Sequence, residues 1–366
     1  MNPTTALTST TLETGTAEPI QFVTADGDIT ALGRRFGIDI ELSRQLFRDM
    51  FLARRFDSEA YSLQRQGELG LWLQCAGQEA AQVGSIRALR DSDHVFPSYR
   101  EHAVVLARGV TPGQLLAQWR GVTHSGWDPA EHHLHFYSLV LGTQTLHATG
   151  YAMGVKLDGT DEVTTVYFGD GAASQGDVNE ALNWAAAGHV PVLFFCQNNQ
   201  WAISTPTTLQ QGAPLHQRAS GFGLESYHVD GNDALAVHAV TSQAAAAVRS
   251  GRGPALIEAR TFRMAGHSTS DDPSRYRTEH EVKEWADRDP LTRLERLLRR
   301  EGTPEDFFDD LEAEAAILAQ NTREACHALA SPDLADLFDH VYAEPHPLMH
   351  LERTRYLAHN ERMQEA

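Results

Sequence analysis

The sequence has few cysteines and no long apolar run, and each absence argues against a class of protein. Its three cysteines, Cys75, Cys196 and Cys326, lie far apart in a chain of 366 residues. This spacing argues against a disulfide scaffold or a cysteine-based zinc site. It favours a reducing compartment, so we expect a cytoplasmic protein. No uncharged apolar stretch approaches the ~18 residues of a membrane helix. The N-terminus also lacks a basic segment followed by an apolar one, so we expect no signal peptide.

Positive charge is scarce as well. The chain has 30 Lys and Arg residues against 49 Asp and Glu residues, which gives a formal net charge of −19. Nucleic acids and anionic membrane surfaces are therefore poor partners, because both attract clustered Lys and Arg. A small anionic ligand remains compatible, since a few local cations and backbone N–H groups can hold it. Hydrophobic residues make up 42% and charged residues 22%, which is typical of a globular protein with a sizeable core.

The apolar pattern predicts an α/β fold with a parallel sheet flanked by helices. Two short apolar runs, Val163–Phe168 and Val192–Cys196, are typical of buried parallel strands, and the segment between them has apolar residues at helical spacing. A second unit follows, with strands near Tyr227–Val229 and Ala255–Ala259. Alternating units of strand, helix and strand imply a parallel sheet with helices on both faces.

We expect three parts along the chain. Residues 1–35 are predicted to be a flexible tail and an extended arm, because the first 17 residues are small, polar and rich in Thr. Residues 36–280 are predicted to be the ligand-binding α/β domain. Residues 281–366 are predicted to be a helical C-terminal extension with apolar residues at helical spacing. The stretch 263–280 is polar, and we expect it to be an irregular loop outside the core.

Polar residues follow each strand of the first unit. Gly169–Ala172, which reads Gly-Asp-Gly-Ala, follows the first strand, and Asn198–Trp201 follows the second. Both strand ends lie at the carboxyl edge of a parallel sheet, where α/β proteins bind ligands. The two glycines allow a phosphate to approach the backbone. The Asp170 carboxylate, the Asn199 amide oxygen and the Trp201 carbonyl, together with phosphate oxygens, suit magnesium.

Two other interpretations of this motif are open. A dinucleotide fingerprint is weakly supported, because Gly169-x-Gly171-x-x-Ser174 lacks its third glycine and the next strand does not end in an acidic residue. Taken alone, the Gly-Asp-Gly half could be a pair of turn glycines, and the Asn-Asn half could be two solvent-facing asparagines. The 26 residues between Gly171 and Asn198 make the combination more specific.

The Gly-Asp-Gly motif, this spacing and Asn-Asn together resemble the thiamine diphosphate motif. The rest of the sequence, from about Pro19 to about Leu357, resembles the alpha subunit of the thiamine-diphosphate-dependent dehydrogenase component of 2-oxo acid dehydrogenase complexes. Further matching segments are Gln64–Gly67, Ala76–Glu79, Tyr99–Glu101, Ala202–Pro206, Val229–Asp233 and Gly266–Asp272. Within the last two segments, Asp230–Asp233 and Ser268–Asp272 are more similar to branched-chain (2-oxoisovalerate) members than to pyruvate members.

The resemblance implies an oxidoreductase of the 3-methyl-2-oxobutanoate dehydrogenase type. Such an enzyme decarboxylates a branched-chain 2-oxo acid and transfers the acyl group to the lipoyl arm of an acyltransferase core. The glutamate that tunes the cofactor belongs to a beta subunit in this family, which implies a heterotetramer of two alpha and two beta chains. A pyruvate or acetoin dehydrogenase alpha subunit is the alternative, and a non-catalytic structural subunit is a further one.

The resemblance also assigns roles to residues. Asp170, Asn199 and the Trp201 carbonyl match magnesium ligands, and His267 matches a catalytic loop histidine that helps the acyl transfer. The residues that match cofactor contacts are Tyr99, Arg100, Leu141, Gly169, Gly171, Ala172, Asn199 and His267. Four positions match a potassium site in relatives, although polar residues at a buried helix start would look the same: Ser138, Val140, Thr143 and Gln144.

Other positions match the mobile loop of the family or depart from its pattern. Arg263, Asp271, Tyr276 and Arg277 match a network that orders the loop. Ser268 matches a position that is phosphorylated in mitochondrial relatives. Gln197 replaces an arginine found near the diphosphate in some branched-chain members, and residues 125–135 replace a basic Gly-Lys-Gly segment.

Overall fold

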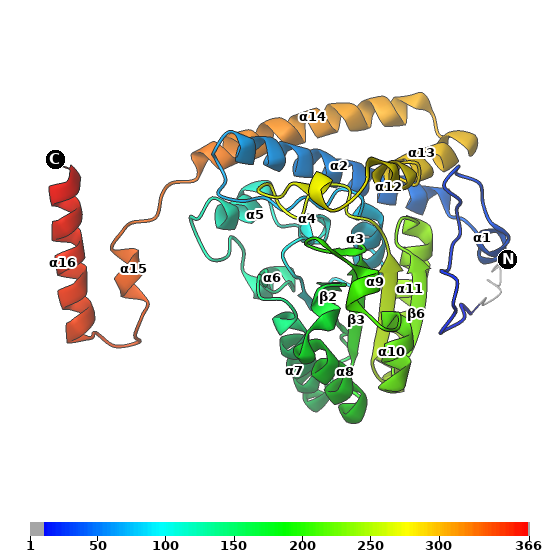
Figure 1. The fold of residues 1–366 in the computed structure, drawn as a ribbon, viewed down its shortest axis with the longest axis horizontal. Helices are drawn as coiled ribbons and strands as arrows, with labels where there is room; N and C mark the ends of the chain where they lie inside the picture. Colours follow the sequence, from blue (N-terminus) through cyan, green and yellow to red (C-terminus); the bar gives the residue numbers. More distant parts are fainter. Residues whose placement is uncertain (1–10, 365–366) are drawn as a thin grey trace, which may run out of the picture.

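The computed structural model describes residues 11–364, and the predicted α/β fold class is confirmed. Its centre is a five-stranded parallel sheet with strand order β1-β2-β3-β7-β6 (Figure 1). The strands are β1 (Val95–Phe96), β2 (Thr164–Gly169), β3 (Val192–Asn198), β6 (Glu225–Asp230) and β7 (Ala255–Arg260). A separate antiparallel hairpin joins β4 (Trp201–Ala202) to β5 (Thr205–Pro206).

Helices cover both faces of the sheet. α7 and α8 lie on one face, and α11 lies on the other, backed by α3. The helices are α1 (Ala31–Phe36), α2 (Ile40–Arg65), α3 (Glu79–Ile86), α4 (His102–Ala107), α5 (Pro112–Trp119), α6 (Pro129–His132), α7 (Thr143–Asp158), α8 (Gly176–Gly188), α9 (Thr207–Gln210), α10 (Leu215–Gly221), α11 (Ala234–Ala247), α12 (Glu279–Ala286), α13 (Pro290–Arg300), α14 (Glu305–Ala328), α15 (Asp336–Asp339) and α16 (Pro347–Gln364). Short 3-10 turns lie at Ala172–Ser174 and Pro273–Arg275, and a π-helical turn lies at Val248–Arg252.

The central strand β3 has a continuous apolar run because it separates two cores. Leu193 and Phe195 of β3 pack in one core with α2, α3 and α11. Val192 and Phe194, which alternate with them, pack in the other core with α7 and α8. Both faces of a parallel sheet are buried in this way, so continuous apolar runs replace the alternation of a half-exposed strand.

The register of the central strands brings the predicted motifs to one edge of the sheet. Gly169, the last residue of β2, is paired with Gln197 near the end of β3. Asp170 and Asn199 therefore leave neighbouring strands at the same level. This is the arrangement expected from the sequence, and it sets the position of the cavity described below.

The described part of the N-terminal segment packs against the domain. Residues 1–10 of the expected tail lie outside the described residues. Leu12, also within the expected tail, is buried, and its backbone N–H donates to Gln243 Oε1 at 2.8 Å. Ile20 forms a parallel bridge to Val229 of β6, and at the other edge of the sheet Leu134 forms one to Val95 of β1. Within residues 11–17, the apolar side chain of Leu12 reaches the core and attaches this polar stretch to the domain.

The C-terminal helices differ in their contacts. α13 and α14 pack along α2, whereas α15 and α16 pack on each other and project from the body (Figure 1). None of the residues of α16 is buried. Among the described residues, no helix is both long and apolar enough to cross a membrane.

Candidate active site

A cavity of about 380 Å3 lies at the carboxyl edge of the sheet, beside the ends of β2 and β3. All the residues predicted to contact the cofactor or magnesium line it. The lining residues are Leu71, Leu73, Gln78, Ser98, Tyr99, Arg100, Glu101, Ser138, Leu139, Leu141, Gln144, Gly169, Asp170, Gly171, Ala172, Gln197, Asn199, Trp201, Ala202, Ile203, Arg263 and His267. The fold thus brings together segments that are separated by up to about 200 residues in the sequence.

The glycine loop after β2 is packed directly beneath the β4–β5 hairpin. A Cβ at Gly171 would lie 2.8 Å from the Cβ of Ala202, so a larger residue would push the two segments apart. Gly171 itself has φ −62° and ψ −41°, which any residue can adopt. The glycine is therefore required for close packing, and a turn conformation does not explain it.

The Asp170 carboxylate is 1% exposed and faces neutral donors. Its Oδ2 lies 3.1 Å from both Thr207 Oγ1 and Gln210 Nε2, which belong to α9. Burial raises the pKa of Asp170 above its usual value, and the hydrogen bonds oppose this shift. A cation bound at this carboxylate would favour its ionised form.

The Asn199 side chain is held in a fixed orientation. Its Nδ2 donates to Gln78 Oε1 at 3.1 Å, and its Oδ1 accepts from the backbone N–H of Trp201 at 3.2 Å. The Trp201 carbonyl accepts from Arg263 Nη1 at 3.1 Å. Gln78 Nε2 is buried, lines the cavity and has no partner among the described residues. An unpaired buried donor favours an acceptor from a bound molecule.

Arg100 connects the cavity wall to the loop that carries His267. Its Nη1 donates to Gln74 O at 2.7 Å and its Nη2 donates to His267 O at 2.8 Å. Asp271 accepts from the backbone N–H of His267 at 2.6 Å. Burial, together with the charges of Arg100 and Arg263, lowers the pKa of His267 to about 4. The imidazole is therefore neutral at pH 7.

Arg263 is fully buried, although we expected the polar stretch that it begins to lie outside the core. Its Nη2 donates to Ile203 O at 2.8 Å and lies 2.8 Å from Tyr276 Oη, which in turn donates to Asp271 at 2.5 Å. Burial lowers the pKa of Arg263 to about 10, so it stays charged at pH 7. The expectation was wrong for this residue, because backbone carbonyls distant in sequence accept hydrogen bonds from both of its terminal nitrogens.

The four potassium candidates are only partly brought together. Ser138 Oγ donates to Val140 O at 3.1 Å, and the buried Gln144 Oε1 has no partner among the described residues. Val140 is 69% exposed, and neither it nor Thr143 lines the cavity. Clusters of three or more His, Cys, Asp or Glu residues that could hold a metal are absent from the described residues. The magnesium ligands predicted from the sequence include one carboxylate, an amide oxygen and a backbone carbonyl. They would therefore not count as a cluster of this kind.

A buried polar network beneath the cavity was not predicted. Glu101 accepts from Gln197 Nε2 at 2.6 Å and from Ser98 Oγ at 2.9 Å, and Gln197 Oε1 accepts from Gln82 Nε2 at 3.0 Å. Burial raises the pKa of Glu101. The segment Gln197-Asn198-Asn199 is one signal that could have indicated it, because three polar residues end an apolar strand.

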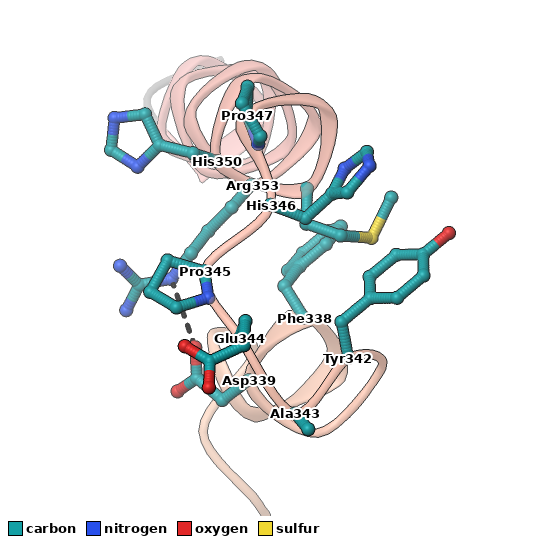
Figure 2. A pocket seen from close by; sticks show the side chains of 11 residues that line it. Phe338, Asp339, Tyr342, Ala343, Glu344, Pro345, His346, Pro347, His350 and Arg353 are labelled. Carbon is teal, nitrogen blue, oxygen red and sulfur yellow. Dashed lines mark ion pairs between the residues drawn. The ribbon is translucent and has the colours of Figure 1, made fainter.

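A second cavity, of about 540 Å3, lies far from the strand ends. Figure 2 shows that its lining comes only from the projecting C-terminal segment, with Phe338 and Tyr342 opposite α16. Arg353 Nε lies 3.8 Å from Asp339 Oδ1 across this cavity. It contains none of the predicted site residues.

Comparison with known proteins finds one family and similar relatives within it. A family model described as "Dehydrogenase E1 component" matches residues 47–325. The chain is 44% identical to the 3-methyl-2-oxobutanoate dehydrogenase subunit alpha of Mycobacterium tuberculosis, over 93% of this chain and 94% of that protein. It is 36% identical to the 2-oxoisovalerate dehydrogenase subunit alpha of Bacillus subtilis, over 84% and 97%. It is also 36% identical to the pyruvate dehydrogenase E1 component subunit alpha of that organism, over 83% of each chain.

Proposed function

Because the chain belongs to the dehydrogenase E1 component family, we propose that it is the alpha subunit of a thiamine-diphosphate-dependent branched-chain 2-oxo acid dehydrogenase. One observation carries this proposal. Gly169, Asp170, Gly171 and Asn199, which lie at neighbouring strand ends, share one cavity with Arg100 and His267. A cavity lined both by groups that can bind phosphate and by leucines suits a molecule with a diphosphate and an apolar ring.

The residues present fit thiamine diphosphate. Gly171 and Ala172 line the cavity, so a phosphate bound there could reach their backbone N–H groups. Arg100 is a charged donor at the same cavity, and Tyr99 lies beside it. Leu141 would contact the aminopyrimidine end. The orphaned Gln78 Nε2 is a further donor for which the cofactor offers acceptors.

Asp170, Asn199 and the Trp201 carbonyl would hold magnesium, because a carboxylate, an amide oxygen and a carbonyl are the hard oxygen ligands that it takes. Ser138, Val140, Thr143 and Gln144 would hold potassium. Gln144 Oε1, which is buried without a partner among the described residues, supports this potassium site. The exposure of Val140 makes the potassium site less well supported than the magnesium site.

Thiamine diphosphate supplies the electron sink for decarboxylation when it is bound. The chain itself orients the reactants. His267 matches the family's loop histidine, and its imidazole would donate or accept a hydrogen bond at a ring nitrogen during acyl transfer to a lipoyl arm. Arg100 and Asp271 fix the backbone on both sides of that histidine.

The proposed partners are a beta subunit and a lipoyl-bearing acyltransferase core, with two alpha and two beta chains in the dehydrogenase. Large apolar side chains that stay exposed on α7 and α8 support a subunit interface there: Leu146, Leu157 and Trp184. The projecting α15–α16 segment supports a second contact. We keep the proposed division into a flexible tail and extended arm over residues 1–35, a cofactor domain over 36–280 and a helical extension over 281–366. The proposed compartment is the cytoplasm, which three separate, buried thiols favour.

The proposed substrate is a branched-chain 2-oxo acid. The apolar wall formed by Leu71, Leu73, Leu139 and Leu141 suits a branched aliphatic group. Pyruvate is the second candidate, because a pyruvate dehydrogenase subunit and a 2-oxoisovalerate dehydrogenase subunit of one organism are both 36% identical to the chain.

Two experiments test the proposal on the chain co-expressed with its beta subunit. Calorimetry with magnesium should detect thiamine diphosphate binding by the wild type and its loss in Asp170→Ala. Asp177→Ala, which removes an exposed carboxylate from the first turn of α8, is the control and should bind normally. Absence of binding by the wild-type complex would refute the proposed function.

A decarboxylation assay then compares 2-oxoisovalerate, 2-oxoisocaproate and pyruvate. We expect a higher kcat/KM for the two branched substrates. Equal or better turnover of pyruvate would transfer the assignment to the pyruvate class and leave the cofactor assignment intact.

A further inference from the structure

Glu258 is a buried carboxylate in β7 that does not line the cavity. It is 3% exposed, and both of its oxygens accept strong hydrogen bonds. Oε1 accepts from Asn198 Nδ2 at 2.7 Å. Oε2 accepts from the backbone N–H of His216 at 2.9 Å and lies 2.7 Å from His216 Nδ1. The carboxylate thus joins the end of β3 to the start of α10.

Asn198 carries this connection to the site. It precedes Asn199, and its Oδ1 accepts from the backbone N–H of Gln200 at 3.2 Å, which closes the turn that ends at Trp201. Thr207 Oγ1 lies 3.2 Å from the same Oδ1 and 3.1 Å from Asp170 Oδ2. One hydroxyl proton can serve only one of these two oxygens at a time. The orientation of the Asn198 amide therefore sets both the turn and the donor available to Asp170.

The polarity of this arrangement is determined by Glu258. Burial opposes its ionisation, but hydrogen bonds from His216 and Asn198 outweigh burial and hold the pKa of Glu258 below its usual value. An ionised carboxylate offers acceptors on both sides, so it fixes the amide of Asn198 with nitrogen toward β7 and oxygen toward the turn. A neutral amide at position 258 could not satisfy both neighbours at once.

We propose that Glu258 is a positioning residue that orients the turn Asn198–Trp201, and with it the ligand set for magnesium and thiamine diphosphate. This role rests on the proposed function, since it concerns the same ligands. Residues that orient metal ligands from behind typically change metal affinity by about 10- to 100-fold when they are replaced. The donor and acceptor pattern of the pair Glu258–Asn198 gives the proposal a specific test.

Four forms of the complex with the beta subunit are compared: wild type, Glu258→Gln, Asn198→Asp and the double variant. Calorimetry measures the Kd for magnesium at saturating thiamine diphosphate. We expect Glu258→Gln to raise the Kd about 10- to 100-fold, because its NH2 group must face a donor of either Asn198 or His216. Asn198→Asp should also raise it, because two carboxylates then face each other.

In the double variant the pattern is restored with its polarity reversed. The amide nitrogen introduced at position 258 donates to the carboxylate introduced at position 198, and the amide oxygen accepts from both N–H groups of His216. We expect the Kd to return to within about fivefold of the wild type, whereas independent defects would multiply. Glu59→Gln is the matched control, because it neutralises another buried carboxylate, which belongs to α2 and is paired with Arg323 at 2.9 Å. It should lower the thermal unfolding temperature without changing the Kd.

The results separate the two proposals. A Kd for Glu258→Gln within about twofold of the wild type would overturn the positioning role, and so would a double variant as weak as the product of the single ones. If Glu258→Gln does not fold, Asn198→Asp and the double variant still decide the question, since only the positioning role predicts that the second substitution improves binding. Failure of the wild type to bind thiamine diphosphate would refute the proposed function itself.

Discussion

The contact between Gly171 and Ala202 leads to a prediction that separates steric fit from backbone conformation. In Gly171→Ala, the new Cβ would lie 2.8 Å from Ala202 Cβ. Carbon atoms prefer about 3.5 Å or more, so the glycine loop and the hairpin must move apart by about 0.7 Å. Overpacking of this kind costs about 1–3 kcal/mol. Because the Trp201 carbonyl lies on the displaced hairpin, we expect the Kd for thiamine diphosphate with magnesium to rise about 5- to 150-fold.

Ala202→Gly provides the compensating change. With Gly at position 202, the nearest atom to the new Cβ is the Cα of that residue, at 3.5 Å, which is ordinary contact. Calorimetry on the complex with the beta subunit should show that the double variant recovers most of the lost affinity, while Ala202→Gly alone changes it little. Normal binding by Gly171→Ala, or no recovery in the double variant, would show that the close contact does not govern the site.

Three further changes test other parts of the structure. Ile203→Gly should raise the free energy of unfolding by about 1 kcal/mol, because a β-branched residue at φ +53° is in the left-handed region; an unchanged or lower thermal unfolding temperature would contradict this. Burial lowers the pKa of His102 to about 3, so the unfolded chain binds its proton first as pH falls below 6.5. The wild type should therefore lose stability relative to His102→Gln by up to about 1.4 kcal/mol per pH unit between pH 6.5 and 3. A difference in unfolding free energy between the two proteins that is the same at pH 5 and pH 8, measured by urea unfolding, would refute this. Arg100→Lys should speed tryptic cleavage of the His267 loop about tenfold by removing a charged hydrogen bond, and an unchanged cleavage rate would show that the loop does not depend on Arg100.

The strand ends could be predicted from the sequence because a short-range pattern determines them. Apolar runs define β2 and β3, and parallel pairing of neighbouring strands then brings Asp170 and Asn199 together. The placement of Tyr99, Arg100 and His267 beside them came from the family resemblance. No local periodicity links residues so far apart.

The features that were missed depend on partners distant in sequence. Arg263 is buried because the carbonyls of Trp201 and Ile203, about 60 residues earlier, accept its donors. Leu12 is buried because α11 offers Gln243 and an apolar surface. When only neighbours in the chain are considered, a polar or isolated residue is predicted to be exposed. The hydrogen-bond acceptors and apolar surface that allow its burial become adjacent only in the assembled fold.

The two bridges at the margins of the sheet have a consequence for solubility. Ile20 pairs with β6 and Leu134 pairs with β1, so in the described part of the chain both outer strands are covered by its own backbone. Open strand edges act as templates for uncontrolled pairing between chains. Partner subunits therefore meet no open outer strand of the five-stranded sheet at these two positions. Loss of the segment around Ile20 would expose β6 and turn a working subunit into one that aggregates.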